Sequence, residues 1–430
     1  DNTQRALSNN SVSYTEKPDV GIFLKEWMAL IASKSGERGI FNRVAAKKQV
    51  EKLGDRRDSN HNFGTNPCSE IILRDKEFCN LTEVVIRPDD TPETLSEKVR
   101  LASILGTWQA TLTDFRYLSK EWKSNCEEEA LLGVSLTGIM DNAYTNGTRV
   151  DGSLTGLLND LKNIAIDTNK KVAKQIGIQP SAAITCVKPS GTVSQLVDAS
   201  SGIHARHSPY YIRTVRGDKK DPLCKFLVGK GIPHESDVTK PEHTWVFSFP
   251  IKTAENAICR NDKTAIEQLE FWKLYQEHWC EHKPSVTITV KEEEWIEVGA
   301  WVFKNFDMIS GISFLPYSDH SYKQAPYQEC SENQYLEMMD KMPQDIDWNV
   351  SKAFRLNWPG VGWFYDATLD GFIEPRPVDK DGESCASWTL NNSTGCYQPP
   401  ITRPAEPGST KYVWDESAYQ GDNTKGWVEV

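Results

Sequence analysis

Residues 61–80 read HNFGTNPCSEIILRDKEFCN, and we expect this stretch to decide both the fold and the chemistry of the chain. Pro67 disfavours helix at Asn66 and favours an extended backbone there. In an extended segment, alternate side chains share one face and lie about 6.6 Å apart. Asn66, Cys68 and Glu70 would then project together as an amide, a thiol and a carboxylate.

This row of three groups suits chemistry on a ligand that carries hydroxyl groups. An amide can orient hydroxyls, a carboxylate can remove a hydroxyl proton, and a thiol can act as a nucleophile or carry a radical. The alternative is a loop with a buried cysteine, an Asx-type turn and a solvated glutamate. The residues alone leave both interpretations open.

Outward from this stretch, candidate strands alternate with long candidate helices. The predicted strands are 70–73, 81–86, 182–187, 245–250, 286–290 and 309–315, and the predicted helices are 91–115, 157–176, 265–279 and 291–305. The charged stretch 47–60 is predicted to be a loop. Strands that alternate with helices of ten or more residues indicate βαβ units, and hence an α/β fold with a parallel sheet or barrel.

A second motif, KPSGTVSQ at 188–195, directly follows the predicted strand that ends at Val187. A proline near the start and serine or threonine caps suit a helix N-terminus, where free N–H groups and the helix dipole attract anions. Gly191 would let the backbone approach a phosphate closely. An ordinary capped helix start fits the same residues.

Composition narrows the class of protein. The net charge of −11 argues against a polynucleotide partner, and no run of 18 apolar residues suggests a membrane span. The ten cysteines include no Cys-x-x-Cys pair, so no metal site is predicted, and scattered cysteines without a signal peptide indicate reduced thiols in the cytoplasm. Because the sequence has no initiator Met, we expect it to start inside a longer protein.

The motif Asn66-Pro67-Cys68-Ser69-Glu70 resembles the finger loop of ribonucleotide reductases. The motif at 188–195 and the sequence SSGIHAR at 200–206 resemble the adenosylcobalamin-dependent, monomeric ribonucleoside-triphosphate reductases. The resemblance extends over roughly residues 8–350. It implies the second half of a ten-stranded α/β barrel with a central finger loop, and it implies adenosylcobalamin as the cofactor.

The same resemblance implies roles for individual residues in the reduction of ribonucleoside triphosphates. Cys68 would be the thiyl radical that abstracts the ribose 3′ hydrogen, Glu70 the base at the 3′ hydroxyl, and Asn66 a ligand of the sugar hydroxyls. Cys79, eleven positions after Cys68, would be a reducing thiol, with core packing as its alternative. The substrate phosphates would be bound by Ser190, Gly191, Thr192 and Ser194.

Domain limits and partners follow from the same comparison of motifs. We predict the end of a first half-barrel at 1–60, a second half-barrel at 61–350, and a Trp- and Pro-rich appendage at 351–430. The N-terminal half of the enzyme is not recognisable, so we expect it as a partner, together with a thioredoxin-like reductant. A non-catalytic, nucleotide-binding fragment of a split or truncated reductase is the rival interpretation.

The family's closely spaced C-terminal cysteine pair is also not recognisable. Cys385 and Cys396 are candidates for a redox-active tail in its place, and an unrelated structural tail is the alternative. The basic residues of 204–216 are read as local ion pairs or a solvated face, with a contribution to the binding of the triphosphate as the alternative. Tyr210 and Tyr211 are read as packing residues.

Overall fold

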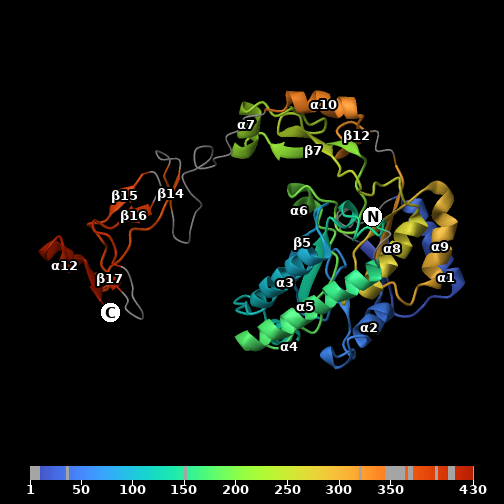
Figure 1. Cartoon of the computed structure of the whole chain (residues 1–430), viewed down its shortest axis with the longest axis horizontal. Coiled ribbons are helices and arrows are strands. Elements are labelled where there is room, and N and C mark those ends of the chain that lie inside the picture. Colours follow the sequence, from blue (N-terminus) through green and yellow to red (C-terminus); the bar gives the residue numbers. More distant parts are fainter. Residues whose placement is uncertain are drawn as a thin grey trace. The chain divides into compact units, whose positions relative to one another are not determined.

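The computed structural model describes residues 10–34, 38–149, 153–318, 322–343, 364–366, 371–392, 396–404 and 412–429 (Figure 1). The chain forms two compact units. The first contains residues 1–213 and 250–335, and the second contains residues 214–249 and 336–430. The domain boundary predicted at residue 350 lies outside the described residues.

The first unit contains most of the regular structure, as an α/β arrangement. Its strands are β1 (Asn10–Tyr14), β2 (Arg38–Asn42), β3 (Gly64–Thr65), β4 (Ile72–Leu73), β5 (Asn80–Val85), β6 (Leu132–Thr137), β10 (Thr287–Val290), β11 (Gly311–Pro316) and β12 (Tyr327–Glu329). Its helices are α1 (Val20–Ser33), α2 (Arg43–Glu51), α3 (Pro92–Gln109), α4 (Lys120–Glu129), α5 (Leu154–Ile176), α6 (Gly191–Leu196), α8 (Ala265–His278) and α9 (Trp295–Lys304), with short 3-10 turns η2 (Gly54–Arg56), η3 (Ile139–Asp141) and η4 (Glu292–Glu294).

Five extended segments of this unit follow one another in parallel. β5 pairs with β6, a single bridge joins Val134 of β6 to Thr185, and another joins Val187 to Pro284 at the start of the β10 segment, which pairs with β11. β11 then pairs antiparallel with β2, and β2 pairs parallel with β1. The wall therefore runs β5–β6–(182–187)–β10–β11–β2–β1, and in the described residues β5 and β1 are its unpaired edges.

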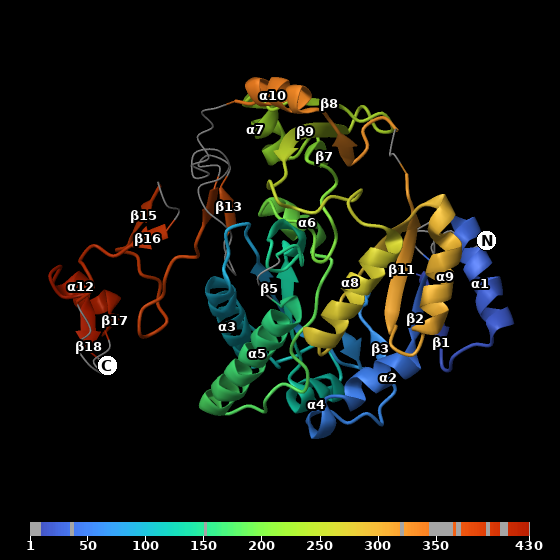
Figure 2. The same ribbon diagram turned by 45° about the vertical axis from the view of Figure 1, so that its right-hand side comes forward.

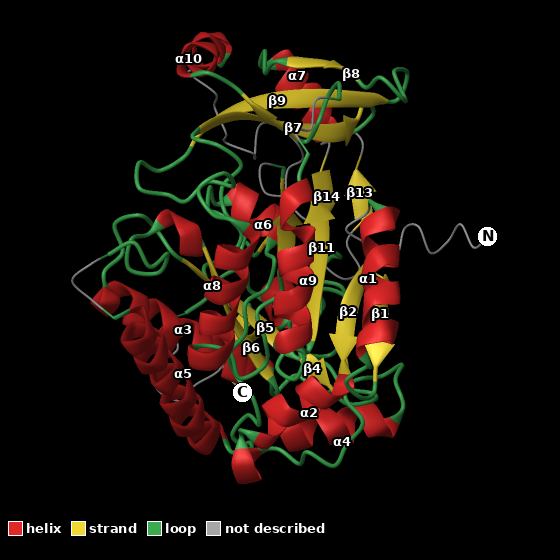
Figure 3. Ribbon diagram, turned by 90° about the vertical axis from the view of Figure 1, so that its right-hand side faces the viewer, coloured by secondary structure: helices red, strands yellow, loops and turns green. Residues whose placement is uncertain are grey.

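Helices cover the outer face of this wall. Figure 2 shows α3 and α5 side by side next to β5, and Figure 3 shows α9 and α1 over β11, β2 and β1. The α8 helix begins with a capping box between Thr264 and Glu267, and it buries Trp272 and Tyr275 completely. The indole of Trp27 in α1 donates to the carbonyl of Trp295 (3.1 Å), which ties α1 to α9.

The short hairpin β3–β4 carries the segment on which the sequence analysis began, with Gly64 opposite Leu73 and Thr65 opposite Ile72. His282 fixes it: the Ile72 N–H donates to His282 Nδ1 (3.3 Å), and His282 Nε2 lies 3.0 Å from the Leu132 carbonyl oxygen. Because Nδ1 is an acceptor, the ring nitrogen that donates is Nε2. The imidazole thus links the hairpin to β6.

Two local predictions were wrong. The stretch 47–60 was predicted to be a loop, but α2 reaches Glu51 because Asn42 caps its first turn and Ala45, Ala46 and Val50 are buried. Segment 182–187 is buried and extended, but it forms only isolated bridges in place of a complete strand. No helix among the described residues is long and apolar enough to cross a membrane.

The second unit is built from short elements. It contains α7 (Pro222–Gly229) and β8 (His234–Ser236), with parts of β7 (Tyr210–Asp218), β9 (Thr244–Lys252) and α10 (Glu332–Lys341). Three hairpins follow, made of β13 (Phe364–Asp366) and β14 (Gly371–Ile373), β15 (Thr389–Asn391) and β16 (Cys396–Gln398), and β17 (Tyr412–Trp414) and β18 (Trp427–Glu429), with α12 (Glu416–Gly421) between the last two strands. Trp388, Trp414 and Trp427 pack edge to face, with ring centroids 5.2–6.0 Å apart.

The buried imidazole predicts an acid-sensitive fold. Burial, followed by the nearby Arg57, lowers the pKa of His282 to about 3 from its ordinary value of 6.5. The unfolded chain therefore takes up a proton below pH 6.5 that the folded chain does not, and stability is lost as the pH falls from about 6.5 to 3. We expect His282→Gln to be less stable than the wild type at pH 7, and the difference in unfolding free energy to shrink by roughly 2 kcal/mol at pH 5. Urea unfolding of both proteins at pH 7 and at pH 5 measures this difference in unfolding free energy. An equal difference at the two pH values would contradict a lowered pKa for His282.

Candidate active site

The segment between β3 and β4 is a closed turn. The Ser69 N–H donates to the Asn66 carbonyl (2.9 Å), Ser69 has a φ of 64°, and the Ile71 N–H donates to Asn66 Oδ1 (3.0 Å). The extended backbone predicted here is therefore wrong, and Asn66, Cys68 and Glu70 do not form a row along a strand. Pro67 does exclude helix, as expected, but Asn66 uses its side chain to close the turn.

The turn is clamped by residues 283–285, which lead into β10. The Ser285 hydroxyl donates to the Cys68 carbonyl (2.5 Å), the Lys283 ammonium donates to the Ser69 hydroxyl (2.7 Å), and the Lys283 N–H donates to the Glu70 carbonyl (3.2 Å). Three consecutive residues of the turn are thus bound to one neighbouring segment. The position of Cys68 is set by the sheet as well as by its own loop.

Cys68 is partly exposed and lines a cavity of about 360 Å³. The walls are about half polar and half apolar. The polar and small residues are Ser11, Gly39, Ser69, Lys283, Ser285, Thr287, Gly311 and Ser313, and the apolar ones are Ile40, Pro67, Pro189, Val286, Ile312 and Leu315. A Cβ on Gly39 would lie 2.9 Å from the Ile312 carbonyl oxygen, and a Cβ on Gly311 would collide with the Lys283 ammonium. Glycine at these two positions therefore leaves the space that the cavity and the clamp occupy.

Glu70 is fully buried beside the same turn. Its Oε1 accepts from the Lys188 ammonium (3.2 Å), and its Oε2 has no hydrogen-bond partner in the part of the chain that the structure describes. Burial lowers the pKa of Lys188, but the nearby Glu70 and Cys68 outweigh burial, so the pKa is raised overall. Glu70 is not among the residues that line the Cys68 cavity, so that cavity does not reach its unpaired Oε2.

Cys79 has Glu70 among its electrostatic neighbours. It packs against Leu131 and Ala183, and a Cβ on Gly133 would lie 3.0 Å from its sulfur. Burial, then Glu70 and Glu77, raise the pKa of the Cys79 thiol well above its ordinary value, so the thiol stays protonated near neutral pH. A protonated thiol is the form that can give up hydrogen.

Sequence reasoning missed three groups at this site. Lys188 and Lys283 contact the turn, and the buried thiol of Cys186 has Cys79 and Glu70 among its electrostatic neighbours. Lys188 opens the second motif and could have been suspected for that reason. Lys283 follows Glu281 and His282 in a polar stretch, and Cys186 lies in the apolar run 182–187; no spacing marks either residue.

The second motif forms a tight turn before the short helix α6. Ser190 and Gly191 have positive φ values of 63° and 39°. The Ser190 hydroxyl donates to the Glu83 carboxylate, and the Ser194 hydroxyl donates to the Gly191 carbonyl (2.7 Å). Both hydroxyl protons are thus used within the protein, while Gly191 and Thr192 are exposed.

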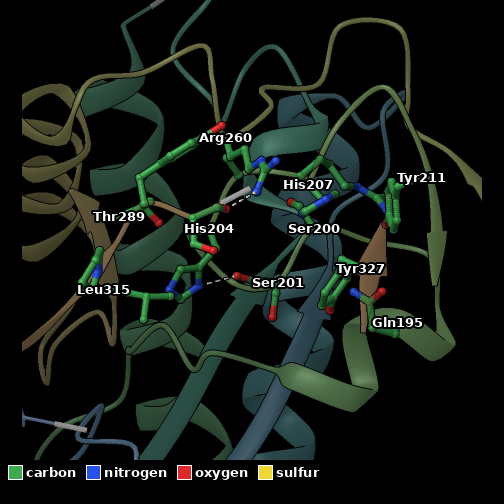
Figure 4. Close-up of a pocket in the computed structure, with 15 residues that line it drawn as sticks. Gln195, Ser200, Ser201, His204, His207, Tyr211, Arg260, Thr289, Leu315 and Tyr327 are labelled. Atoms are coloured by element: carbon green, nitrogen blue, oxygen red, sulfur yellow. Dashed lines mark hydrogen bonds between the residues drawn. The ribbon is translucent and has the colours of Figure 1, made fainter. Parts of the chain in front are cut away.

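A cavity of about 220 Å³ adjoins the end of this motif, and Figure 4 shows Gln195, Ser201 and His204 among its lining residues. His204 Nδ1 donates to the Ser201 carbonyl (2.9 Å), while Nε2 accepts from the Thr287 N–H (3.0 Å), and burial lowers the pKa of this imidazole. His204 is therefore neutral and structural.

The remaining basic residues near this cavity form mainly local pairs. Arg206 donates to both carboxylate oxygens of Asp141 (2.8 and 2.9 Å), and Arg213 donates to the Pro326 carbonyl (2.9 Å). The ring of Tyr211 packs against Tyr327, with centroids 5.9 Å apart. These contacts agree with the interpretation of the stretch as ion pairs and packing.

Cys385 and Cys396 lie in the second unit. Cys385 is buried, and burial, then Glu416 and Asp379, raise the pKa of its thiol to about 11. Cys396 begins β16, opposite Asn391. No group of three or more His, Cys, Asp or Glu side chains among the described residues is arranged to hold a metal ion.

Known proteins resemble this chain in sequence and in fold. No family model matches it. The adenosylcobalamin-dependent ribonucleoside-triphosphate reductase of Lacticaseibacillus paracasei is 29% identical over 357 residues, which cover 75% of this chain and 46% of that protein. The protein of the same name from Euglena gracilis is 29% identical over 296 residues, which cover 68% of this chain and 39% of that protein.

A solved structure of a B-12-dependent (class II) ribonucleotide reductase matches with a TM-score of 0.65 at 25% identity. The match covers 79% of this chain and 50% of that one. These findings confirm the resemblance inferred from the two motifs. The chain spans about half the length of the curated relatives, or less.

We expect a large coupling free energy between substitutions of Lys188 and Glu70. Lys188→Met would leave a buried carboxylate unpaired, which typically costs about 3–5 kcal/mol, and adding Glu70→Gln should recover most of that loss. Lys98 and Asp90 form the matched control, because Asp90 also accepts from the Arg87 N–H and the Thr94 hydroxyl and so stays satisfied after Lys98→Met. Chemical unfolding of the single and double variants gives the coupling energies. Equal values for the two pairs would show that Glu70 is not specially dependent on Lys188.

Proposed function

We propose that this chain carries the reactive centre of an adenosylcobalamin-dependent reductase that converts ribonucleoside triphosphates to 2′-deoxyribonucleotides. The observation that carries the proposal is the clamped turn, in which Cys68 lines a cavity of mixed polarity while Glu70, two residues on, is fully buried. The names of the related proteins supply the reaction and the cofactor.

The wall of seven extended segments supports a barrel of the kind that the family uses. Five parallel segments followed by two of opposite direction suit one half of a ten-stranded α/β barrel joined to the end of the other half. Edge strands with unpaired backbone groups invite further pairing. We infer that additional strands, from an N-terminal half of the enzyme, pair along β5 and β1 and close the wall.

Within this reaction, the geometry suggests a division of labour around the turn. Cys68 would exchange a hydrogen atom with the ribose 3′ carbon. Glu70 would accept the 3′ hydroxyl proton at its free Oε2, while Lys188 holds Oε1. The Asn66 amide nitrogen would orient the sugar hydroxyls, since its oxygen is already bound to the Ile71 N–H. Cys79 and a second thiol, expected from the N-terminal half of the enzyme, would supply the proton with which the 2′ hydroxyl leaves as water and the two electrons of the reduction, and the two thiols would be oxidised to a disulfide.

The cavity beside Cys68 fits part of the cofactor. At about 360 Å³ it lies near the lower end of the range for small-ligand pockets, large enough for a nucleoside group but not for a corrin ring. Its serine and threonine oxygens can accept from the hydroxyls of a ribose, while the Ser285 proton goes to the Cys68 carbonyl and the Thr287 and Ser313 hydroxyls bond each other. When bound, adenosylcobalamin would supply the radical through homolysis of its cobalt–carbon bond. The residues that would hold its nucleoside end are Ser11, Ser285, Thr287 and Ser313.

The substrate phosphates would bind at the turn before α6. With the Ser190 and Ser194 hydroxyl protons used internally, Gly191 and Thr192 are the members of the motif that are exposed to a phosphate. A thioredoxin-like reductant would restore the Cys79 thiol, directly or through Cys385 and Cys396. The non-catalytic rival predicts nucleotide binding without cobalt–carbon homolysis.

The first test concerns Cys68. In its full-length context, Cys68→Ser should abolish both deoxynucleotide formation and cobalt–carbon homolysis, because a hydroxyl lacks the weak S–H bond that can carry the radical. Cys330→Ser is the matched control, since Cys330 is also partly exposed. Chromatography of the products and stopped-flow absorbance follow the two events. Near wild-type rates from Cys68→Ser would remove this thiol from the mechanism.

The second test concerns Glu70. Glu70→Gln should slow reduction by a factor of about 10² to 10⁴, the usual contribution of a positioned base, while leaving nucleotide binding nearly unchanged. Turnover and equilibrium dialysis with a ribonucleoside triphosphate separate the two effects. A parallel loss of binding and turnover would instead assign Glu70 to substrate binding.

A further inference from the structure

Lys283 is an unusual residue for the interior of a protein. Its side chain is fully buried, yet it forms no ion pair within the described ranges, and the one hydrogen bond of its ammonium there is to the Ser69 hydroxyl. The Nζ atom occupies the space over Gly311, where a Cβ would collide with it. The Lys283 ammonium is therefore enclosed in the protein without an acidic side chain in direct contact with it among the described residues.

Stability does not explain this arrangement. Removing a charged group from water is unfavourable, and replacing such a group by an apolar side chain of similar volume is often neutral or stabilising. Methionine would fill the same slot without a charge. The ammonium must therefore be accounted for by what it contacts.

What it contacts is the tip of the Cys68 turn. Ser69 has left-handed backbone geometry, which is unfavourable for a residue with a side chain, so an outside contact is needed to hold it. Its hydroxyl is held by Lys283 and also receives the Thr65 hydroxyl (3.2 Å). Loss of the ammonium would release the residue that directly follows Cys68.

We propose that Lys283 is a positioning residue, whose ammonium holds Ser69 in its left-handed conformation and thereby fixes the Cys68 thiol at the cavity. The inference rests on the proposed function only in treating Cys68 as the reactive thiol. Lys283 does not itself react. It acts through Ser69.

The same contact makes the turn sensitive to pH. Burial lowers the pKa of Lys283 to about 7, against the opposing effects of Glu70 on the turn and Cys280 on its own segment. On β11, the uncharged Gly311 lies against the ammonium, and the Glu70 side chain is paired with Lys188. Deprotonation near pH 7 would replace the ammonium by a neutral amine, a weaker donor to the Ser69 hydroxyl, so the turn should loosen as the pH rises through 7.

The experiment compares the full 430-residue chain with Lys283→Met by hydrogen exchange of residues 66–71, without any ligand. A hydrogen bond to a charged group is worth enough that its loss should reduce protection of the turn about ten- to a hundredfold. The melting temperature at pH 7 should stay equal or rise, because a buried charge is removed. In the wild type, protection corrected for intrinsic exchange should fall between pH 6 and 8, and in Lys283→Met this step should be absent.

Two controls separate positioning from general packing. Lys162→Met removes a partly buried ammonium that contacts the Glu277 carbonyl (3.4 Å), and it should leave the turn unchanged. In Lys283→Ala, ethylammonium should restore protection of the turn, whereas tetramethylammonium, which has the charge but no N–H donor, should not.

Unchanged protection in Lys283→Met, or equal effects of the two ammonium salts on Lys283→Ala, would overturn the proposal. A lower melting temperature for Lys283→Met, together with no pH step in the protection of the wild-type turn, would also overturn the proposal, since Lys283 would then be a packing residue. These readouts need no cofactor or nucleotide. Failure of the proposed reduction would appear instead in the Cys68→Ser comparison, so the two failures are distinguishable.

Discussion

The hydrogen bonds from residues 283–285 to three consecutive residues of the Cys68 turn are the constraint on which the rest of the site depends. A four-residue turn that contains a left-handed residue needs contacts from outside the turn to stay in one conformation. Here its backbone and side chains are bound to the entrance of β10, a segment fixed by pairing on both sides. The parallel sheet thereby fixes the position of the Cys68 thiol.

Two lysine side chains contact the same turn. The chain is acidic overall, but two lysines meet at the turn, one on each side of it. Lys188 pairs with the Glu70 carboxylate and leaves one oxygen free, whereas Lys283 binds a neutral hydroxyl. A buried acceptor and a buried donor therefore remain in one small region, as a site prepared for a polar ligand requires.

Long helices and strands could be predicted from the sequence because their apolar residues repeat over many positions, whereas short turns could not. The long helices at 92–109, 154–176 and 265–278 and the strands at 80–85 and 311–316 follow periodicity, and they lie within a few residues of their predicted positions. The α/β class was predicted for that reason, and the motifs at 66–70 and 188–195 identified the related proteins. The extended backbone at 66–70 was wrong because a short turn obeys side-chain hydrogen bonds, here from Asn66, more than local preference. Lys283 and Cys186 were missed because their contacts come from residues distant in sequence.

Gly39, Gly133 and Gly311 show what it takes to keep such a site open. Each occupies a strand, where glycine lowers stability by roughly 0.5–1 kcal/mol relative to alanine, and each gives up its side-chain volume to a neighbour: a carbonyl oxygen, the Cys79 sulfur and the Lys283 ammonium. Alanine at any of the three would bring its Cβ to within 3.0 Å of a neighbouring atom, so the usual gain from replacing glycine is not available here. Even one added methyl group at these positions would displace a backbone carbonyl, the Leu81 side chain or the Lys283 ammonium, so the three glycines set how thick this wall can be.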